Sequence, residues 1–178
     1  MKYQEIYNEY TGLLNEYCKL HHELCSLPKG TVVRKRISGK DYYYLQYTSF
    51  GKKKTEYLRE CDIDETCIKL EQGKDLRIRI EVVNDNINRI EKAVRILDSQ
   101  MSRLFVFLRQ CADMDALPLN KRTNALSFAN AMVALEGISA KQETEENLRA
   151  WAMGEKRFAD FYLPTLARYK ILEDYDGT

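Results

Sequence analysis

Apolar residues recur at alternating intervals of four and three positions in two long segments of the chain. In residues 2–26 the repeating positions are Ile6, Tyr10, Leu13, Tyr17, Leu20 and Leu24. The second set consists of Leu76, Ile80, Val83, Ile87, Ile90, Val94, Leu97, Met101, Leu104 and Leu108. This heptad spacing is typical of helices that pack along a shared seam. We therefore expect two long helices folded into an antiparallel hairpin, with the second continuous over four heptads.

The second helix is predicted to be the longer of the two. Part of its seam, from Met101 to Leu108, would then lie beyond the reach of the first helix. That part must meet either the C-terminal helices or a second copy of the chain. Intramolecular pairing of the two helices is favoured because their seams share a period, and a homodimer through the long helix stays open.

Residues 31–58 have the composition of strands, because β-branched residues and tyrosines occur there in three runs. Turn signals at residues 38–40 and 49–51 separate the runs. The pattern predicts a three-stranded antiparallel meander at the turn of the hairpin. On its middle strand, Tyr43, Leu45 and Tyr47 would share one face, opposite Tyr42, Tyr44 and Gln46. A short helix or turn is expected at residues 61–75, with Gly73 as a break before the second long helix.

Three further helices are expected near the C-terminus, beyond a boundary at residues 112–121 that contains Pro118. The first would run from Asn120 or Thr123 to Glu136. The second would start at Ser139, which forms a capping box with Gln142, and end at Gly154. The third carries Phe158, Phe161, Leu166 and Tyr169, and Pro164 should kink or split it. Trp151 and these aromatic residues would form a small core.

The predicted fold class is mainly α with a small antiparallel β-meander. We expect two parts: residues 1–112 form a helix, sheet and long-helix stalk, and residues 113–178 form a three-helix module. A length of 178 residues is compatible with this division.

The composition of the chain argues against several classes of function. The net charge of +1 gives no overall attraction to nucleic acid or anionic lipid. The five cysteines are odd in number and show no CxxC spacing, which favours reduced thiols in the cytoplasm. No apolar run approaches the ~20 residues that a membrane span needs. No catalytic, metal-binding or phosphate-binding pattern is present, so we expect neither an enzyme nor a cofactor.

The segment SFANAMVALEGI, residues 127–138, has apolar side chains in nearly every direction of a helical wheel. Such a helix is expected to be buried on several sides. Glu136 would lie in its last turn, where a carboxylate is disfavoured by roughly 0.3–1 kcal/mol at an exposed site. Helix stability therefore does not explain why a glutamate occupies position 136. The residues expected to dock on a partner are Phe128, Asn130, Met132, Val133 and Leu135.

The run NAMVALEGI, with the polar segment after it and the terminal LARY, resembles the VbhA-like antitoxins that inhibit Fic-type AMP-transferase toxins. The resemblance covers roughly the last third of the chain. In that family the inhibitory helix carries Ser or Thr, three residues, Glu, and then Gly or Asn. Glu136 and Gly137 match the last two positions, whereas Met132 departs from the first. The resemblance implies that Glu136 pairs with an arginine at the toxin's ATP site and blocks AMP transfer.

A nucleic-acid-binding protein is the alternative. A basic, tyrosine-rich sheet offers charge for phosphates and aromatic rings for bases. The candidate contacts are Arg34, Arg36, Lys52, Lys53 and Lys54. The competing explanation is that tyrosines fill a small core and lysines protect exposed edges. The stretch also resembles a bacterial segment of the form LPKG, basic strand, YYYLQY, which implies no activity. A coiled-coil scaffold is a third option.

Overall fold

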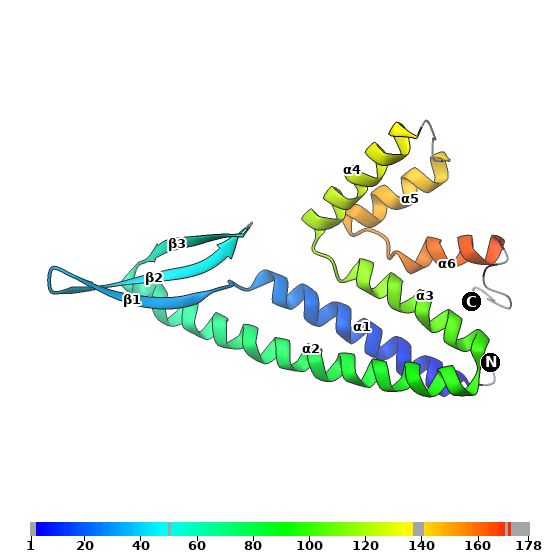
Figure 1. Ribbon diagram of the computed structural model, residues 1–178, viewed down its shortest axis with the longest axis horizontal. Helices are drawn as coiled ribbons and strands as arrows, with labels where there is room; N and C mark the ends of the chain where they lie inside the picture. The colour runs from blue at the N-terminus through cyan, green and yellow to red at the C-terminus, as the bar shows by residue number, and fades with distance from the viewer. Residues whose placement is uncertain (1–2, 50, 137–140, 170, 172–178) are drawn as a thin grey trace. The chain divides into compact units, whose positions relative to one another are not determined.

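The computed structural model describes residues 3–49, 51–136, 141–169 and 171. These residues form six α-helices, a short 3-10 helix and one antiparallel sheet of three strands, so the predicted fold class is confirmed (Figure 1). The helices are α1 (Gln4–Ser26), α2 (Ile63–Leu97), α3 (Ser99–Asp115), α4 (Leu119–Leu135), α5 (Gln142–Met153) and α6 (Ala159–Arg168). The strands are β1 (Thr31–Ile37), β2 (Lys40–Ser49) and β3 (Lys52–Leu58), followed by the 3-10 helix η1 (Glu60–Asp62).

Contacts group the chain into two compact units. The first contains Met1–His22 and Val82–Thr178, and the second contains Glu23–Glu81. The boundary that the sequence suggested, between residues 112 and 113, does not coincide with these units. It falls inside α3, and both of its sides belong to the first unit.

The second unit holds the sheet, with strand order β1-β2-β3. The β1–β2 turn is the predicted one: Ser38 and Gly39 have φ values of 50° and 81°, and both are positive as a two-residue hairpin turn requires. Cross-strand pairs such as Val33 with Tyr44 and Tyr44 with Tyr57 fix the register. Among the sheet residues that the structure describes, Leu45 alone is buried, at 8% exposure.

The predicted break at Gly73 is wrong, and so is the separate short helix before it. Helix α2 begins at Ile63 and continues through Gly73. Gly73 is buried, and the methyl groups of Leu24 and Leu27 lie 3.9 Å from where its Cβ would be. Glycine costs a helix interior about 1 kcal/mol, a penalty that the flanking turns of a long packed helix can absorb.

The predicted continuous second helix is also wrong, because the chain reverses at Asp98. Asp98 is extended, with φ −156° and ψ 115°, and its carboxylate accepts hydrogen bonds from the backbone N–H groups of Gln100 and Met101. It is the N-cap of α3. As a result Leu97, a predicted seam residue, is 59% exposed.

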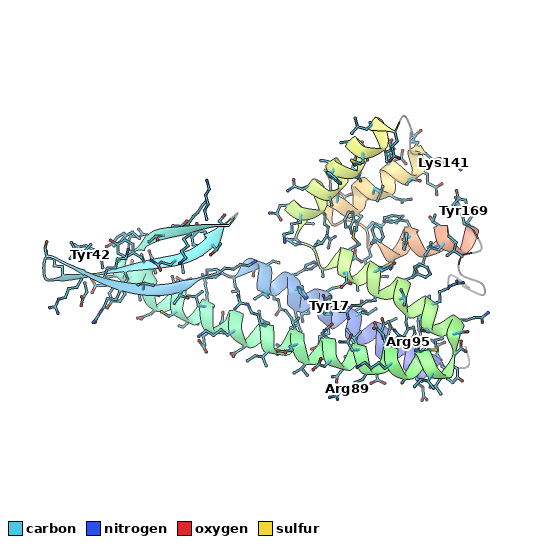
Figure 2. All side chains as sticks on the ribbon, viewed as in Figure 1. Tyr17, Tyr42, Arg89, Arg95, Lys141 and Tyr169 are labelled. Carbon is cyan, nitrogen blue, oxygen red and sulfur yellow. The ribbon has the colours of Figure 1, made fainter. Side chains whose placement is uncertain are left out.

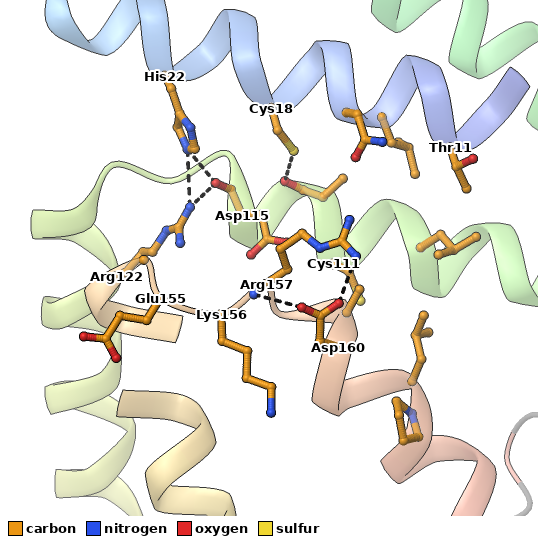
Figure 3. Close-up of a pocket in the computed structure, with 18 of the residues that line it drawn as sticks. Thr11, Cys18, His22, Cys111, Asp115, Arg122, Glu155, Lys156, Arg157 and Asp160 are labelled. Carbon is orange, nitrogen blue, oxygen red and sulfur yellow. Dashed lines mark hydrogen bonds and ion pairs between the residues drawn. The ribbon is translucent and has the colours of Figure 1, made fainter. Parts of the chain in front are cut away.

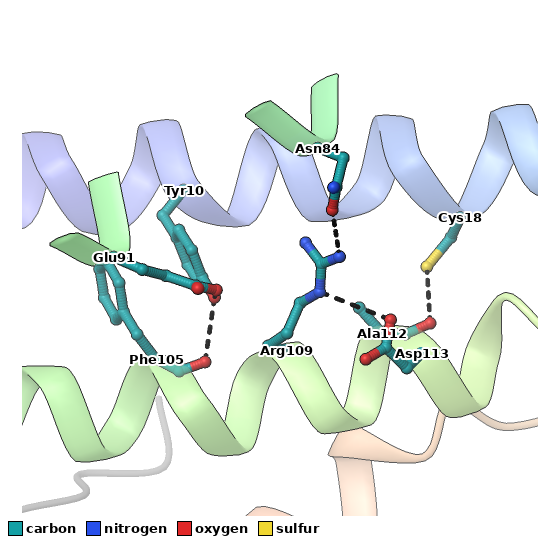
Figure 4. Close-up of polar contacts among 8 residues, drawn as sticks. All are labelled: Tyr10, Cys18, Asn84, Glu91, Phe105, Arg109, Ala112 and Asp113. Carbon is teal, nitrogen blue, oxygen red and sulfur yellow. Dashed lines mark hydrogen bonds and ion pairs between the residues drawn. The ribbon is translucent and has the colours of Figure 1, made fainter. Parts of the chain in front are cut away.

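In the first unit, α3 folds back on α1 and α2, so the seam from Met101 to Leu108 is covered within one chain. The Tyr10 and Phe105 rings stack at 3.9 Å, and the Tyr10 hydroxyl donates to the Glu91 carboxylate (2.7 Å) and to the Phe105 carbonyl (3.0 Å) (Figure 4). Burial raises the pKa of Tyr10, so it stays a donor. The Cys18 thiol donates to the Ala112 carbonyl, 3.3 Å away. Later residues of α1 contact later residues of α3, so the two helices run parallel.

Helices α4, α5 and α6 complete the first unit, with α4 packed on α5 and α6 on α3. Helix α5 ends as predicted at Gly154, whose φ is 80°. The expected capping box rests on Ser139, which lies outside the described residues. Pro164 was predicted to kink or split this helix; α6 continues through Pro164, so the split does not occur.

The predicted aromatic core is confirmed for Trp151, Phe158 and Phe161 but is wrong for Tyr169, which is 65% exposed. Trp151 is 1% exposed, and its ring lies 5.3 Å from that of Phe158, which in turn contacts Phe161 at 5.0 Å. This core is shared with α3, because the Phe107 ring lies 6.3 Å from that of Tyr162.

Candidate functional site: an exposed apolar helix and a basic sheet

Helix α4 carries the predicted docking residues, and it is much more exposed than its composition suggests. We expected burial on several sides, but within this chain only Arg122 of α4 is buried. Phe128 is 69% exposed, Met132 44% and Leu135 83%. Asn130 is also exposed, and Val133 is half-buried. The expectation fails because α4 packs mainly on α5, which leaves much of its apolar surface open to a partner.

Glu136 is the C-cap residue of α4, directly after the exposed apolar side chains. Its side chain is exposed, and its backbone N–H donates to the Met132 carbonyl at 3.2 Å. Met132 and Glu136 therefore lie one helical turn apart. Gly137, the other residue matched to that pattern, lies outside the described residues.

Arg122 anchors the first turn of α4 to the rest of the unit. Its guanidinium donates to the carbonyls of Leu117 (2.9 Å) and Trp151 (3.2 Å). It also donates to the carbonyl of Asp115 (Figure 3). It also lies over the Trp151 ring, 5.5 Å from the centroid. A buried guanidinium is tolerated only when its donors are satisfied, as they are here. The direction in which α4 projects is thus set at its N-terminal end, away from Glu136.

Asp115 ties the same anchor to α5 and α6. Its carboxylate accepts from the indole N–H of Trp151 (3.0 Å) and from the backbone N–H of Phe158 (2.9 Å). The Nε2 atom of His22 lies 2.7 Å from the Asp115 carbonyl oxygen. Burial raises the pKa of Asp115, although the two hydrogen bonds act in the opposite direction.

A groove of about 780 Å³ lies beside this anchor, between α1, α3 and the segment that leads into α6 (Figure 3). Its basic side chains already have protein partners: Arg157 donates to Asp160 (3.0 Å), and Lys156 donates to the Asn147 side chain (2.7 Å). Its thiols are poor nucleophiles, since burial raises the pKa of Cys18 to about 11 and that of Cys111 to about 12.

Among the described residues, no group of three or more His, Cys, Asp and Glu side chains could hold a metal ion. No helix in the described part of the chain is both long and apolar enough to cross a membrane. All five cysteines are free thiols.

The five residues predicted to contact nucleic acid do not share one face of the sheet. Register places Arg34, Arg36, Lys52 and Lys54 on the face of Leu45, and Lys53 on the face of Tyr44. Acids partly neutralise the Leu45 face: Arg34 pairs with Asp41 at 3.7 Å, and Glu56 accepts a hydrogen bond from the Tyr47 hydroxyl.

Comparison of the chain with protein-family models, with curated proteins and with solved structures found no match.

Sequence reasoning missed the anchor formed by Asp115, Arg122 and His22. Pro118 lies between the two charged residues, and the sequence predicts only a boundary at residues 112–121. No local signal singles out Arg122, because the neighbouring Lys121 is also charged and yet is exposed.

Proposed function

We propose that this chain is an antitoxin that inhibits a Fic-type AMP-transferase toxin. In this proposal α4 docks on the toxin, and Glu136 occupies the position near its ATP site. The observation that carries the proposal is the exposed apolar surface of α4, which leads directly to an exposed carboxylate at the end of the helix. The resemblance of residues 130–138 to the inhibitory helix of VbhA-like antitoxins supplies the identity of the partner.

The exposed side chains of α4 are the kind that give affinity in helix-in-groove interfaces. Phe128, Met132 and Leu135 recur at intervals of four and three residues, which places them along one side of the helix. Burial of one such side chain contributes about 1.5–3 kcal/mol, and a few of them usually dominate an interface. Docking would therefore depend on these residues and only weakly on Glu136.

Glu136 would act by charge and position. A carboxylate can take both N–H groups of an arginine fork, which are the groups that otherwise bind a phosphate. In the family pattern a Ser or Thr hydroxyl lies one turn before the Glu. Met132 has no hydroxyl, so Glu136 alone would supply the polar contact.

The test begins with the neighbouring reading frame, which should encode a Fic-domain protein. The two proteins are co-expressed and purified, and transfer of AMP from labelled ATP is measured. The native chain should form a stable complex that does not transfer AMP. Glu136→Gly should leave the complex intact and raise AMP transfer about tenfold or more, the effect expected from loss of one charge-assisted hydrogen bond.

Two control variants distinguish binding to the toxin from inhibition of its AMP transfer. Glu143→Gln changes another exposed glutamate, in the first turn of α5, and should leave inhibition unchanged. Phe128→Asp should abolish the complex itself. The proposal fails if no complex forms with the Fic protein. The role of Glu136 fails if Glu136→Gly still inhibits completely.

A further inference from the structure

The two faces of the sheet differ in charge. Paired residues on neighbouring strands point to the same side of a sheet, so the register assigns every side chain to a face. We call the side that carries Tyr44 the acid-free face. Its described members are Thr31, Val33, Lys35, Ile37, Lys40, Tyr42, Tyr44, Gln46, Thr48, Lys53, Thr55 and Tyr57. These residues include three lysines and three tyrosines, and none is an acid.

The three tyrosines form a cluster at the surface. The Tyr44 and Tyr57 rings meet edge to face at 5.7 Å, and the Tyr42 and Tyr57 rings are 6.3 Å apart. The ammonium group of Lys35 lies 5.1 Å from the centre of the Tyr44 ring. Tyr57 is 58% exposed, and Tyr42, labelled in Figure 2, is half-buried. The rings are therefore held in place by one another while part of their surface stays accessible.

The opposite face has different chemistry. It contains Asp41 and Glu56, which engage Arg34 and Tyr47, and it carries the one buried side chain described in the sheet, Leu45. The one side chain that the sheet buries thus lies on the Leu45 face. The tyrosines of the acid-free face are not explained by a need to fill that core.

We infer that the acid-free face binds single-stranded nucleic acid. Unpaired bases stack on the tyrosine cluster, and phosphates pair with Lys35, Lys40 and Lys53. A duplex hides the flat surfaces of its bases, so an aromatic cluster on a sheet selects unpaired strands. The absence of carboxylates from the described residues of this face removes the repulsion that phosphates would otherwise meet. This activity is separate from the proposed inhibition, which uses α4.

The experiment measures fluorescence anisotropy of labelled oligo(dT) and oligo(U) with the full chain across a salt series. Three phosphate contacts predict a slope of log K against log salt of about −2 for single strands. A duplex of the same length should bind at least about fivefold more weakly, because stacking is lost. The comparison of the two oligonucleotides shows whether the strand is DNA, RNA or either.

Adjacent residues supply matched variants, since Lys53 and Lys54 point to opposite faces. Lys53→Glu should weaken binding and reduce the salt slope by about one or more, while Lys54→Glu should have a much smaller effect. Tyr57→Leu should weaken binding at least about fivefold, and Tyr47→Leu on the other face should not. Circular dichroism of each variant checks that the sheet is retained, and Lys35→Glu on β1 provides a second test of the same face.

Several results would overturn the inference. These are no binding at low salt, equal losses from Lys53→Glu and Lys54→Glu, equal binding of duplex and single strand, and equal binding of polyglutamate. The last of these would indicate an acidic protein segment as the ligand. Each result is independent of AMP-transfer inhibition.

Discussion

At the scale of single residues, Asp115 connects the C-terminal helices to α1 and α3. Its carboxylate accepts from two partly buried donors, on Trp151 and Phe158, and its carbonyl faces His22 and Arg122. One side chain and one peptide group thus link α1, α3, α4, α5 and the start of α6.

Two substitutions of Asp115 distinguish the contribution of its hydrogen bonds to stability from that of its charge. Asp115→Ala leaves two partly buried N–H groups without an acceptor and should lower the free energy of unfolding by about 1–3 kcal/mol. Asp115→Asn keeps an oxygen in place and should cost much less. Urea unfolding followed by the fluorescence of Trp151, the single tryptophan, measures both.

The raised pKa of Asp115 should also make the free energy of unfolding of the native protein depend on pH. A carboxyl group whose folded pKa is raised contributes stability that is complete below its unfolded pKa of about 3.9 and is lost as pH rises through the folded pKa. The native chain should therefore lose stability relative to Asp115→Asn as pH rises from about 4 into that window. A difference that does not change with pH would contradict the assignment.

At the scale of elements, the break at Asp98 determines how the long helices pack. The seven-residue repeat continues across this point, from Val94 to Met101, because α2 and α3 both bury their apolar positions. Periodicity alone therefore predicts one helix. The signal that distinguishes two helices is chemical: an aspartate before Ser99 is a good N-cap.

Asp98→Ala should lower the free energy of unfolding by about 1 kcal/mol, because two N–H groups at the start of α3 lose their acceptor. Asp98→Ser should restore most of this loss. Asp85→Ala, at an exposed position within α2, is the matched control and should change stability by less than about 0.5 kcal/mol. Equal effects at residues 85 and 98 would mean that the cap contributes nothing specific.

The strands were easier to predict than the helices. Each run of β-branched and aromatic residues is bounded by a turn with its own backbone requirement, so the sequence marks both ends of β2. Helix ends at Gly154 and near Pro118 were predictable for the same reason. The position of α3 was not, because contacts between residues nearly one hundred positions apart leave no local pattern.

At the scale of the whole molecule, the part of the apolar seam that suggested a dimer is covered within one chain. Met101, Phe105 and Leu108 are each at most 8% exposed within one chain. Exposed apolar side chains lie on α4, the predicted docking helix, and also on α2, where Ile78 is 60% exposed and Ile96 86%. A dimer through the long helix stays a prediction. The exposure of α4 could not be predicted, since an all-round apolar sequence indicates burial without saying which chain provides it.

We expect the isolated protein to sediment as a single chain of 20.9 kDa at micromolar concentration. Any weak self-association should arise from α4 and disappear in a Phe128→Ser, Leu135→Ser variant. Sedimentation velocity at several concentrations measures this. A stable dimer that persists in the double variant would show that a different surface joins two copies.

The parallel packing of α1 on α3 also has a consequence for synthesis on the ribosome. Tyr10, Cys18 and His22 contact residues that lie 95, 94 and 93 positions later in the chain. At about 5–20 residues per second, roughly 5–20 seconds of translation separate each helix position from its partner. During that interval the stacking surface of Tyr10 has no Phe105 to cover it, so the nascent chain is a natural substrate for chaperones that hold exposed apolar helices.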